Sequence, residues 1–291
     1  MCARKKKETV LVTGAGGFIG RYVVKELSDN YPYDIHAFRG DLFSTNLDYY
    51  VGRLAPSYLI NLAWVTGEGY LDSRENLMFV QKSLELYDAF YGYGGRRAVF
   101  IGTEQEYGRS DKPLSETDEI SPISYYAECK ADLGRILLKS SEVGGNGFVW
   151  CRMFFIYGAG EKPKRLAPSL IRGLLAGERV NCSYEGLVRD YVYVKDAAGA
   201  ICRCLASDFS GAVNISGGRD TTIGEIAELV RKNTNPEGEV VFQSREECSQ
   251  FPYIRGDIGR LESLGWTHRY PLESGLLEEI DEIRAETRGE K

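Results

Sequence analysis

The chain has 291 residues, of which 43% are hydrophobic and 27% are charged, and its formal net charge is −6 at pH 7. This length suits one large α/β unit or two unequal lobes, and the hydrophobic content is enough for a sizeable core. The acidic net charge argues against a surface that binds nucleic acid through overall positive charge. The sequence contains no run of about 18 apolar residues, so no membrane-spanning helix is predicted. We therefore expect a cytoplasmic protein with no nucleic-acid and no membrane partner.

The seven cysteines are spaced irregularly without a CxxC pair, and the two histidines, His36 and His268, lie far apart in the sequence. This spacing predicts neither a zinc site nor a disulfide framework, so no metal ligands are expected. It is typical of a protein from a reducing compartment. The basic run at residues 4–7 is interpreted as a solvated tail.

In chain order, short β-branched segments alternate with helical patterns through the first half of the chain. Strands are predicted at residues 9–13, 34–38, 58–63, 97–102 and 147–153, and helices after the turn at 14–17 and at 73–91 and 125–140. This alternation predicts a parallel, doubly wound α/β sheet.

From about residue 159 the pattern is less regular. Helices are expected near 166–176, 194–206 and 222–233, with a strand and a turn in 180–193. We therefore expect a Rossmann-like domain over residues 8–158, to which later segments return, and a smaller α/β lobe over residues 159–291.

A glycine-rich turn follows the first predicted strand, with Gly14, Gly17 and Gly20 in the spacing TGxxGxxG. The first glycine permits a tight turn, the second lets the backbone approach a pyrophosphate, and the third lets the next helix pack against the sheet. The helix N-terminus then offers unpaired N–H groups to the phosphates. Because the glycines stand between a strand and a helix, they predict dinucleotide binding.

The group that reads the adenosine ribose is expected at the end of the second strand, about 20 residues further on. Arg39 and Asp41 stand there. Arg39 could pair with a 2′-phosphate, whereas Asp41 could bind a ribose hydroxyl or the adenine edge. NADP(H) is therefore the favoured cofactor, with NAD(H) as the alternative.

Tyr126 and Lys130 are four residues apart on a predicted helix, which places both on one face. A tyrosine with a pKa near ~10 is a poor acid–base group at neutral pH, and a neighbouring ammonium lowers that pKa. Lys130 can also hold the nicotinamide ribose. Upstream, Thr103 follows the strand at 97–102, at the edge where ligands bind in such sheets. Its hydroxyl can hold a substrate oxygen next to Tyr126.

Together these motifs resemble the extended short-chain dehydrogenase/reductase family of nucleotide-sugar epimerases and dehydratases. The resemblance also rests on Leu62-Ala63, Tyr107-Gly108, RMFFIYG at 152–158, RDYVYVKD at 189–196, NISG at 214–217 and LGW at 264–266. It covers residues 9–283. It implies a smaller lobe that binds a nucleotide-diphosphate sugar, and a homodimer in which the helices at 73–91 and 125–140 form a four-helix bundle.

The resemblance also implies roles for individual residues. Thr103 and Tyr126 stand at the reacting oxygen, Lys130 binds the ribose, and Arg189 matches an arginine that contacts the substrate nucleotide or its phosphates. The candidate cofactor contacts are Gly14, Gly17, Phe18, Ile19, Gly20, Arg39, Asp41, Leu42, Leu62, Ala63, Tyr126 and Lys130. The candidate substrate contacts are Thr103, Glu104, Gln105, Phe155 and Arg189.

Departures from the family pattern narrow the choice of reaction. Sugar 4,6-dehydratases of this family follow the threonine with Asp-Glu, the acid and base of water elimination, where this chain has Glu104 and Gln105. Gln105 cannot act as a carboxylate base, so dehydration is disfavoured. Phe155 replaces an asparagine of the RxFNxYG motif that contacts the sugar nucleotide, so that polar contact is lost.

The chain looks most similar to the compact reductase and epimerase branch around CDP-abequose synthase. We expect an NAD(P)-dependent oxidoreductase that reduces the 4-keto group of a nucleotide-linked deoxysugar, with Tyr126 as proton donor. A 4-epimerase with tightly held NAD would use the same three residues and is the first alternative. A non-catalytic, nucleotide-sensing member of the fold is the second, although such a protein is expected to lose Tyr126 or Lys130.

Overall fold

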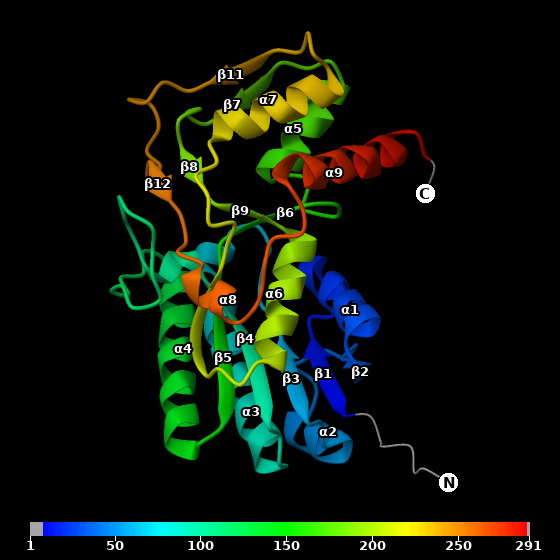
Figure 1. Ribbon diagram of the computed structural model, residues 1–291, viewed down its shortest axis with the longest axis vertical. Coiled ribbons are helices and arrows are strands. Elements are labelled where there is room, and N and C mark those ends of the chain that lie inside the picture. The colour runs from blue at the N-terminus through cyan, green and yellow to red at the C-terminus, as the bar shows by residue number, and fades with distance from the viewer. Residues whose placement is uncertain (1–7, 290–291) are drawn as a thin grey trace.

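The computed structural model describes residues 8–289, so the basic run at 4–7 lies outside the described residues. Its central sheet has six parallel strands in the order β10-β5-β4-β3-β1-β2 (Figure 1). They are β1 (Thr9–Thr13), β2 (Asp34–Ala37), β3 (Tyr58–Asn61), β4 (Arg97–Thr103), β5 (Gly147–Met153) and β10 (Gly211–Ile215). The parallel, doubly wound fold is thereby confirmed. Because β2 and β3 flank β1 on opposite sides, the winding reverses there, and ligands bind at the carboxyl ends of strands at such a point.

Each face of the sheet has its own layer of helices. One layer contains α2 (Leu47–Leu54), α3 (Glu75–Gly92) and α4 (Tyr125–Gly144), and the other contains α1 (Phe18–Asn30) and α6 (Val194–Ala206). Strand side chains alternate between the layers, as the pleat requires. Leu59 and Phe100 pack under the first layer, whereas their neighbours Ile60 and Val99 pack under the second. The near-continuous apolar strands follow from this burial on both faces.

Helix α2 lies between the second and third strands, where no element was predicted. The Asn46 side chain caps it by accepting a hydrogen bond from the Tyr49 N–H at 3.0 Å. Leu47 and Val51, four residues apart, are its two buried residues. The helix is too short for its apolar spacing to stand out in the sequence, although the cap is a recognised start signal.

A smaller lobe lies beyond the carboxyl ends of the central strands (Figure 1). Its core is enclosed by α5 (Leu166–Leu175), α7 (Ile223–Thr234) and α9 (Leu272–Thr287). The lobe also carries the parallel strand pairs β6 (Phe155–Tyr157) with β9 (Tyr191–Tyr193), β7 (Val180–Cys182) with β11 (Val240–Phe242), and β8 (Val188–Arg189) with β12 (Tyr253–Ile254). Between these segments α6, β10 and the short helix α8 (Gly259–Ser263) return to the central sheet.

A buried ion pair joins the end of β4 to β5. The Glu106 side chain is 1% exposed, and one of its oxygens accepts a hydrogen bond from the Arg152 Nε at 2.8 Å. The other oxygen accepts from the Thr103 backbone N–H at 2.8 Å, and the Trp150 indole donates to both oxygens at 3.1 Å. The carboxylate is thus fully partnered, which is the condition under which a buried charge is tolerated. Among residues 8–289, no helix is long and apolar enough to cross a membrane.

Removing the Glu106 carboxylate should therefore destabilise the fold. We expect Glu106→Ala to lower the free energy of unfolding by about 3–5 kcal/mol, because Arg152 would stay buried without its counter-ion. Chemical denaturation measures this loss. Glu142→Ala is the matched control: it removes an exposed ion pair with Lys139 at 2.9 Å and should cost less than about 1 kcal/mol. Equal, small losses of unfolding free energy in both variants would contradict this role of Glu106.

Candidate active site

The glycine-rich turn packs between the end of β1, the residues just after β3 and the start of α1. Gly14 has a φ of +66°, in the left-handed region, and a Cβ there would lie 2.8 Å from the Ala63 nitrogen and the Leu62 carbonyl carbon. A Cβ at Gly20, in the first turn of α1, would overlap the Gly14 carbonyl oxygen. The Gly17 N–H donates to that oxygen at 3.0 Å. These positions require glycine because the turn leaves no room for a side chain.

The start of α1 fits the pyrophosphate of a dinucleotide. Gly17 is the N-terminal cap residue, and within the described chain no side chain accepts a hydrogen bond from the first N–H groups of the helix. Gly17 is exposed, and Phe18 and Ile19 are half-buried beside it. Free N–H groups and the positive end of the helix dipole at an open turn form an anion site.

The loop after β2 places Arg39 and Asp41 in different roles. Both residues are exposed. An Asp41 carboxylate oxygen accepts a hydrogen bond from the Phe43 N–H at 3.0 Å, so that side chain helps to form the loop itself. Within residues 8–289, the Arg39 side chain has no hydrogen-bond or ion-pair partner. Leu42 is 8% exposed and packs into the core, anchoring the loop rather than presenting its side chain outward.

The structure brings Thr103, Tyr126 and Lys130 together at the end of β4. Tyr126 and Lys130 lie in the first two turns of α4, which begins where the Ser124 hydroxyl accepts a hydrogen bond from the Ala127 N–H at 3.2 Å. The Thr103 hydroxyl is a hydrogen-bonding neighbour of Tyr126. The Lys130 Nζ donates to the Ile101 carbonyl oxygen at 2.6 Å.

The electrostatics of Tyr126 differ from the sequence-based expectation that Lys130 lowers its pKa. Burial raises the pKa of Tyr126, and the nearby Glu104 carboxylate raises it further. Burial also lowers the pKa of Lys130 to about 7, although the Glu106 charge opposes this shift. The Lys130 ammonium is directed to Ile101 instead of the phenol, so Tyr126 is held protonated at neutral pH. A protonated tyrosine is a proton donor.

Glu104 and Gln105 follow Thr103 in a short 3₁₀-helix, η2 (Glu104–Glu106). The Thr103 hydroxyl donates to a Glu104 carboxylate oxygen at 2.9 Å. Burial raises the pKa of Glu104 to about 6, against the opposing effects of the Thr103 hydrogen bond and the Arg165 charge. The Gln105 side-chain oxygen accepts from the Ser124 hydroxyl at 3.4 Å, at the start of α4. Glu104, whose pKa is raised toward neutral pH, is therefore hydrogen-bonded to Thr103, and Thr103 is the hydrogen-bonding neighbour of Tyr126.

Arg189 brings a buried cation from the smaller lobe toward the same site. It is 5% exposed and donates to the Val188 carbonyl oxygen at 2.8 Å and to the Gln250 side-chain oxygen at 3.1 Å. No carboxylate forms an ion pair with it in the described part of the chain, although its charge interacts with that of Glu104, and burial lowers its pKa. A buried guanidinium without a counter-ion favours binding of an anion.

Phe155, the residue in place of the family asparagine, faces this guanidinium. The ring centroid of Phe155 lies 5.7 Å from the central carbon of the Arg189 guanidinium and 5.5 Å from the Tyr191 ring. The position thus contributes an aromatic surface rather than an amide.

Two aromatic residues at the site were absent from the sequence prediction. The rings of Trp64 and Tyr70 lie 6.5 and 5.0 Å from the Tyr126 ring, measured between centroids. Trp64 directly follows Leu62 and Ala63, so its place after the third strand could have indicated a residue near the ligand-binding edge of the sheet. Tyr70 lies in the 3₁₀-helix η1 (Tyr70–Asp72), and no pattern in the sequence indicated it.

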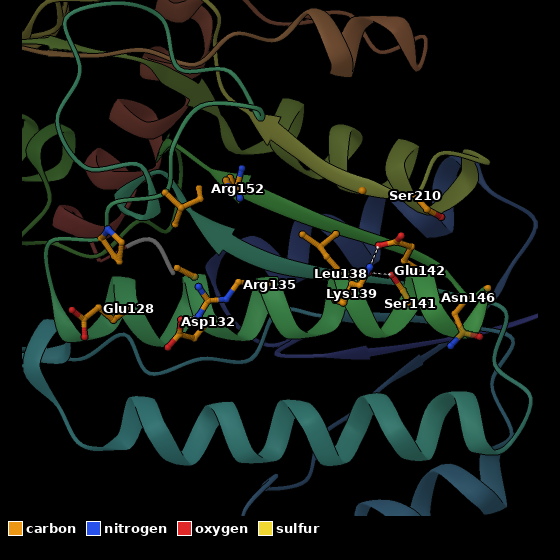
Figure 2. A pocket seen from close by; sticks show the side chains of 15 residues that line it. Glu128, Asp132, Arg135, Leu138, Lys139, Ser141, Glu142, Asn146, Arg152 and Ser210 are labelled. Atoms are coloured by element: carbon orange, nitrogen blue, oxygen red, sulfur yellow. Dashed lines mark hydrogen bonds and ion pairs between the residues drawn. The ribbon is translucent and has the colours of Figure 1, made fainter.

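A separate groove of about 960 Å³ runs along α4 toward the start of β10 (Figure 2). Charged side chains of α4 line it, among them Asp132, Arg135, Lys139 and Glu142. Neither Tyr126 nor Lys130 is among the lining residues. Within the described residues, no group of three or more His, Cys, Asp or Glu side chains could hold a metal ion.

The fold and the turn thus define a Rossmann-type protein with a dinucleotide site. Residues 10–216 match the model of the NAD dependent epimerase/dehydratase family. The chain belongs to this family.

Among solved structures, the UDP-glucose 4-epimerase of Thermotoga maritima with UDP-glucose is 25% identical, with a TM-score of 0.84 over 96% of this chain and 99% of that one. RMD from Pseudomonas aeruginosa complexed with NADPH shares the fold, at 23% identity and a TM-score of 0.83 over 96% of this chain and 100% of that one.

Among curated proteins, a trifunctional UDP-glucose 4,6-dehydratase/UDP-4-keto-6-deoxy-D-glucose 3,5-epimerase/UDP-4-keto-L-rhamnose-reductase of Arabidopsis thaliana is 23% identical over 95% of this chain and 47% of its own length. The chain thus spans about half the length of the first curated relatives it matches.

The turn geometry gives a matched pair of variants. Gly14→Ala should lower the free energy of unfolding by about 1–3 kcal/mol and weaken cofactor binding, because at a positive φ its Cβ meets the backbone of Leu62 and Ala63, just after β3. Gly16→Ala adds a Cβ that meets nothing within 4 Å and should leave both properties unchanged. Thermal unfolding and titration with reduced nicotinamide cofactor test the pair. Normal cofactor binding by a folded Gly14→Ala protein would argue against this turn as the dinucleotide site.

Proposed function

We propose that this protein is a 4-ketoreductase that acts on a nucleotide-diphosphate sugar. The observation that carries the proposal is the position of Glu104, hydrogen-bonded to Thr103 beside a protonated Tyr126. A carbonyl reduction adds a hydride and a proton in each turnover, so its proton donor must be reprotonated from solvent. Glu104, with a pKa of about 6, is suited to supply that proton.

A bound, reduced nicotinamide cofactor would supply the hydride for C4. When Glu104 is protonated, its O–H can donate to the Thr103 oxygen, which frees the Thr103 hydroxyl to donate a hydrogen bond to the carbonyl oxygen. The Tyr126 hydroxyl donates its proton to that oxygen as the alcohol forms. Thr103 then passes a proton from Glu104 to Tyr126, and Glu104 takes up another from water. Lys130 binds the ribose of the cofactor.

The first alternative is a 4-epimerase with tightly held NAD, and the similarity to the Thermotoga maritima 4-epimerase supports it. Epimerisation begins by oxidising a hydroxyl, which requires Tyr126 as a phenolate base. Burial and the Glu104 charge disfavour that phenolate, but the reduction forms it too when Tyr126 gives up its proton, so the proton supply separates the two reactions. Epimerisation returns its proton within the cycle and needs no external donor. For the non-catalytic alternative the sequence offers no support, because both Tyr126 and Lys130 are present.

Substrate recognition is assigned to the smaller lobe. We infer that residues 8–158 mainly bind the cofactor and that residues 159–291 mainly bind the sugar nucleotide. Arg189 would pair with the diphosphate, since it is a buried cation without a carboxylate partner in the described chain. Phe155 and Tyr191 would pack against the nucleotide or the sugar ring. The six cysteines in the described residues are free, which fits a cytoplasmic enzyme.

Tyr126→Phe should fold and bind cofactor but lose turnover by about 10²–10⁴-fold, because the proton donor is missing. Tyr125→Phe is the matched control at the neighbouring, exposed position and should keep full activity. Reduced-cofactor consumption with a 4-keto sugar nucleotide measures both variants. Activity of Tyr126→Phe within a few-fold of the unmodified protein would remove Tyr126 from this role.

Arg39 supports a preference for NADPH, because its guanidinium is unpaired in the described chain while Asp41 is engaged in its own loop. We expect Arg39→Ala to weaken NADPH binding by about tenfold or more and to leave NADH binding nearly unchanged. Direct binding titrations with both cofactors measure this. Tighter NADH binding by the unmodified protein, or equal losses for both cofactors, would show that Asp41 reads the ribose instead.

We also infer a homodimer formed through α3 and α4. These adjacent helices carry exposed apolar side chains, with Leu77 49%, Met78 46%, Ile136 46% and Val143 79% exposed. Such side chains are suited to a symmetric, self-complementary interface. Light scattering at micromolar concentration should give twice the mass of the chain, and a monomer under these conditions would contradict the inference.

A further inference from the structure

The indole of Trp64 covers the ammonium group of Lys130. The Lys130 Nζ lies 3.6 Å from the centroid of the Trp64 ring, well inside the range of a cation–π contact. Lys130 is only 4% exposed. Such contacts are strongest when the cation is removed from water, and tryptophan is the best aromatic partner.

Neighbouring side chains fix the orientation of the indole. Its N–H donates to the Asn76 side-chain oxygen at 2.8 Å. The Asn76 amide in turn donates to the carbonyl oxygens of Tyr70 at 2.6 Å and Ser73 at 2.9 Å. Phe79 stacks on the indole with centroids 5.5 Å apart. The ring face that meets Lys130 is therefore held by both a hydrogen-bond chain and packing.

The charge on Lys130 depends on few groups. Its Nζ donates to the Ile101 carbonyl oxygen at 2.6 Å on the β4 side. The Glu106 carboxylate favours the charged form of Lys130 from η2, and Glu104, Tyr126 and Tyr70 are further titratable groups at this site. Burial lowers the pKa of Lys130 to about 7, so each group that favours the ammonium matters near neutral pH.

We propose that Trp64 is a positioning residue for Lys130, because its indole keeps the lysine charged and directed toward the end of β4. The Lys130 ammonium is then already aligned when it contacts the nicotinamide ribose. This role for Trp64 in cofactor binding rests on the proposed function, whereas its effect on the titration of Lys130 does not.

The test compares variants that keep or remove the ring face. Trp64→Phe keeps an aromatic face, whereas Trp64→Leu and Trp64→Met remove it with different side-chain shapes, so that one of them serves if the other fails to fold. Phe79→Leu removes the ring that stacks on the indole but keeps the face that meets the ammonium, so it tests the packing that holds the indole. The titration of Lys130 is followed by NMR on protein labelled with ¹³C at the lysine ε-carbon, without cofactor, and Lys130→Met assigns the signal.

Trp64→Leu and Trp64→Met should lower the titration midpoint of Lys130 by about one pH unit. Trp64→Phe should stay close to the unmodified protein, and Phe79→Leu should give a smaller shift than the two ring-deleted variants. Cofactor affinity at pH 8 should fall in the same order. An unchanged midpoint in both ring-deleted variants would overturn the proposal. If the midpoint shifts while no sugar nucleotide is reduced by the unmodified protein, the positioning role stands and the proposed function fails.

Discussion

The candidate active site depends on one buried carboxylate, that of Glu106. Its oxygens accept hydrogen bonds from the Thr103 N–H, the Trp150 indole and the Arg152 guanidinium, so the end of β4 is fixed to β5. Thr103 cannot shift without leaving one of these groups unpaired in the interior, which is costly. The same network sets the start of η2, and η2 carries Glu104 into place beside Tyr126.

Arg152 extends this constraint into the rest of the fold. It also donates to the Tyr107 hydroxyl at 2.9 Å, and that hydroxyl donates to the Asn214 side-chain oxygen at 2.6 Å. Asn214 lies on β10, the strand that returns to the sheet after the first part of the smaller lobe. A polar network therefore links the strand that carries Thr103 to the segment that brings the chain back from the smaller lobe. Networks of this kind favour one arrangement of the chain over others when every member is partnered.

The sequence predicted the sheet well, since five of its strands were recognised and these are apolar runs bounded by turn signals. It missed α2, whose buried face has only Leu47 and Val51, and β10, which is a short strand far along the chain from its neighbour β5. The Tyr126 and Lys130 spacing predicted that both reach one place. Their pKa directions could not be predicted, because burial and the position of Glu104 depend on tertiary packing. Trp64 follows a strand end, but only tertiary packing shows that its ring covers Lys130.

The central claim is that Tyr126 donates a proton that Glu104 replaces during net reduction. The most direct measurement mixes the purified protein with NADPH and a panel of 4-keto and 4-hydroxy sugar nucleotides, and follows both cofactor oxidation and product mass. The account predicts that a 4-keto substrate gains two hydrogen atoms with one NADPH oxidised for each product. Conversion of a 4-hydroxy sugar nucleotide to an isomer of the same mass, without consumption of NADPH, would contradict it.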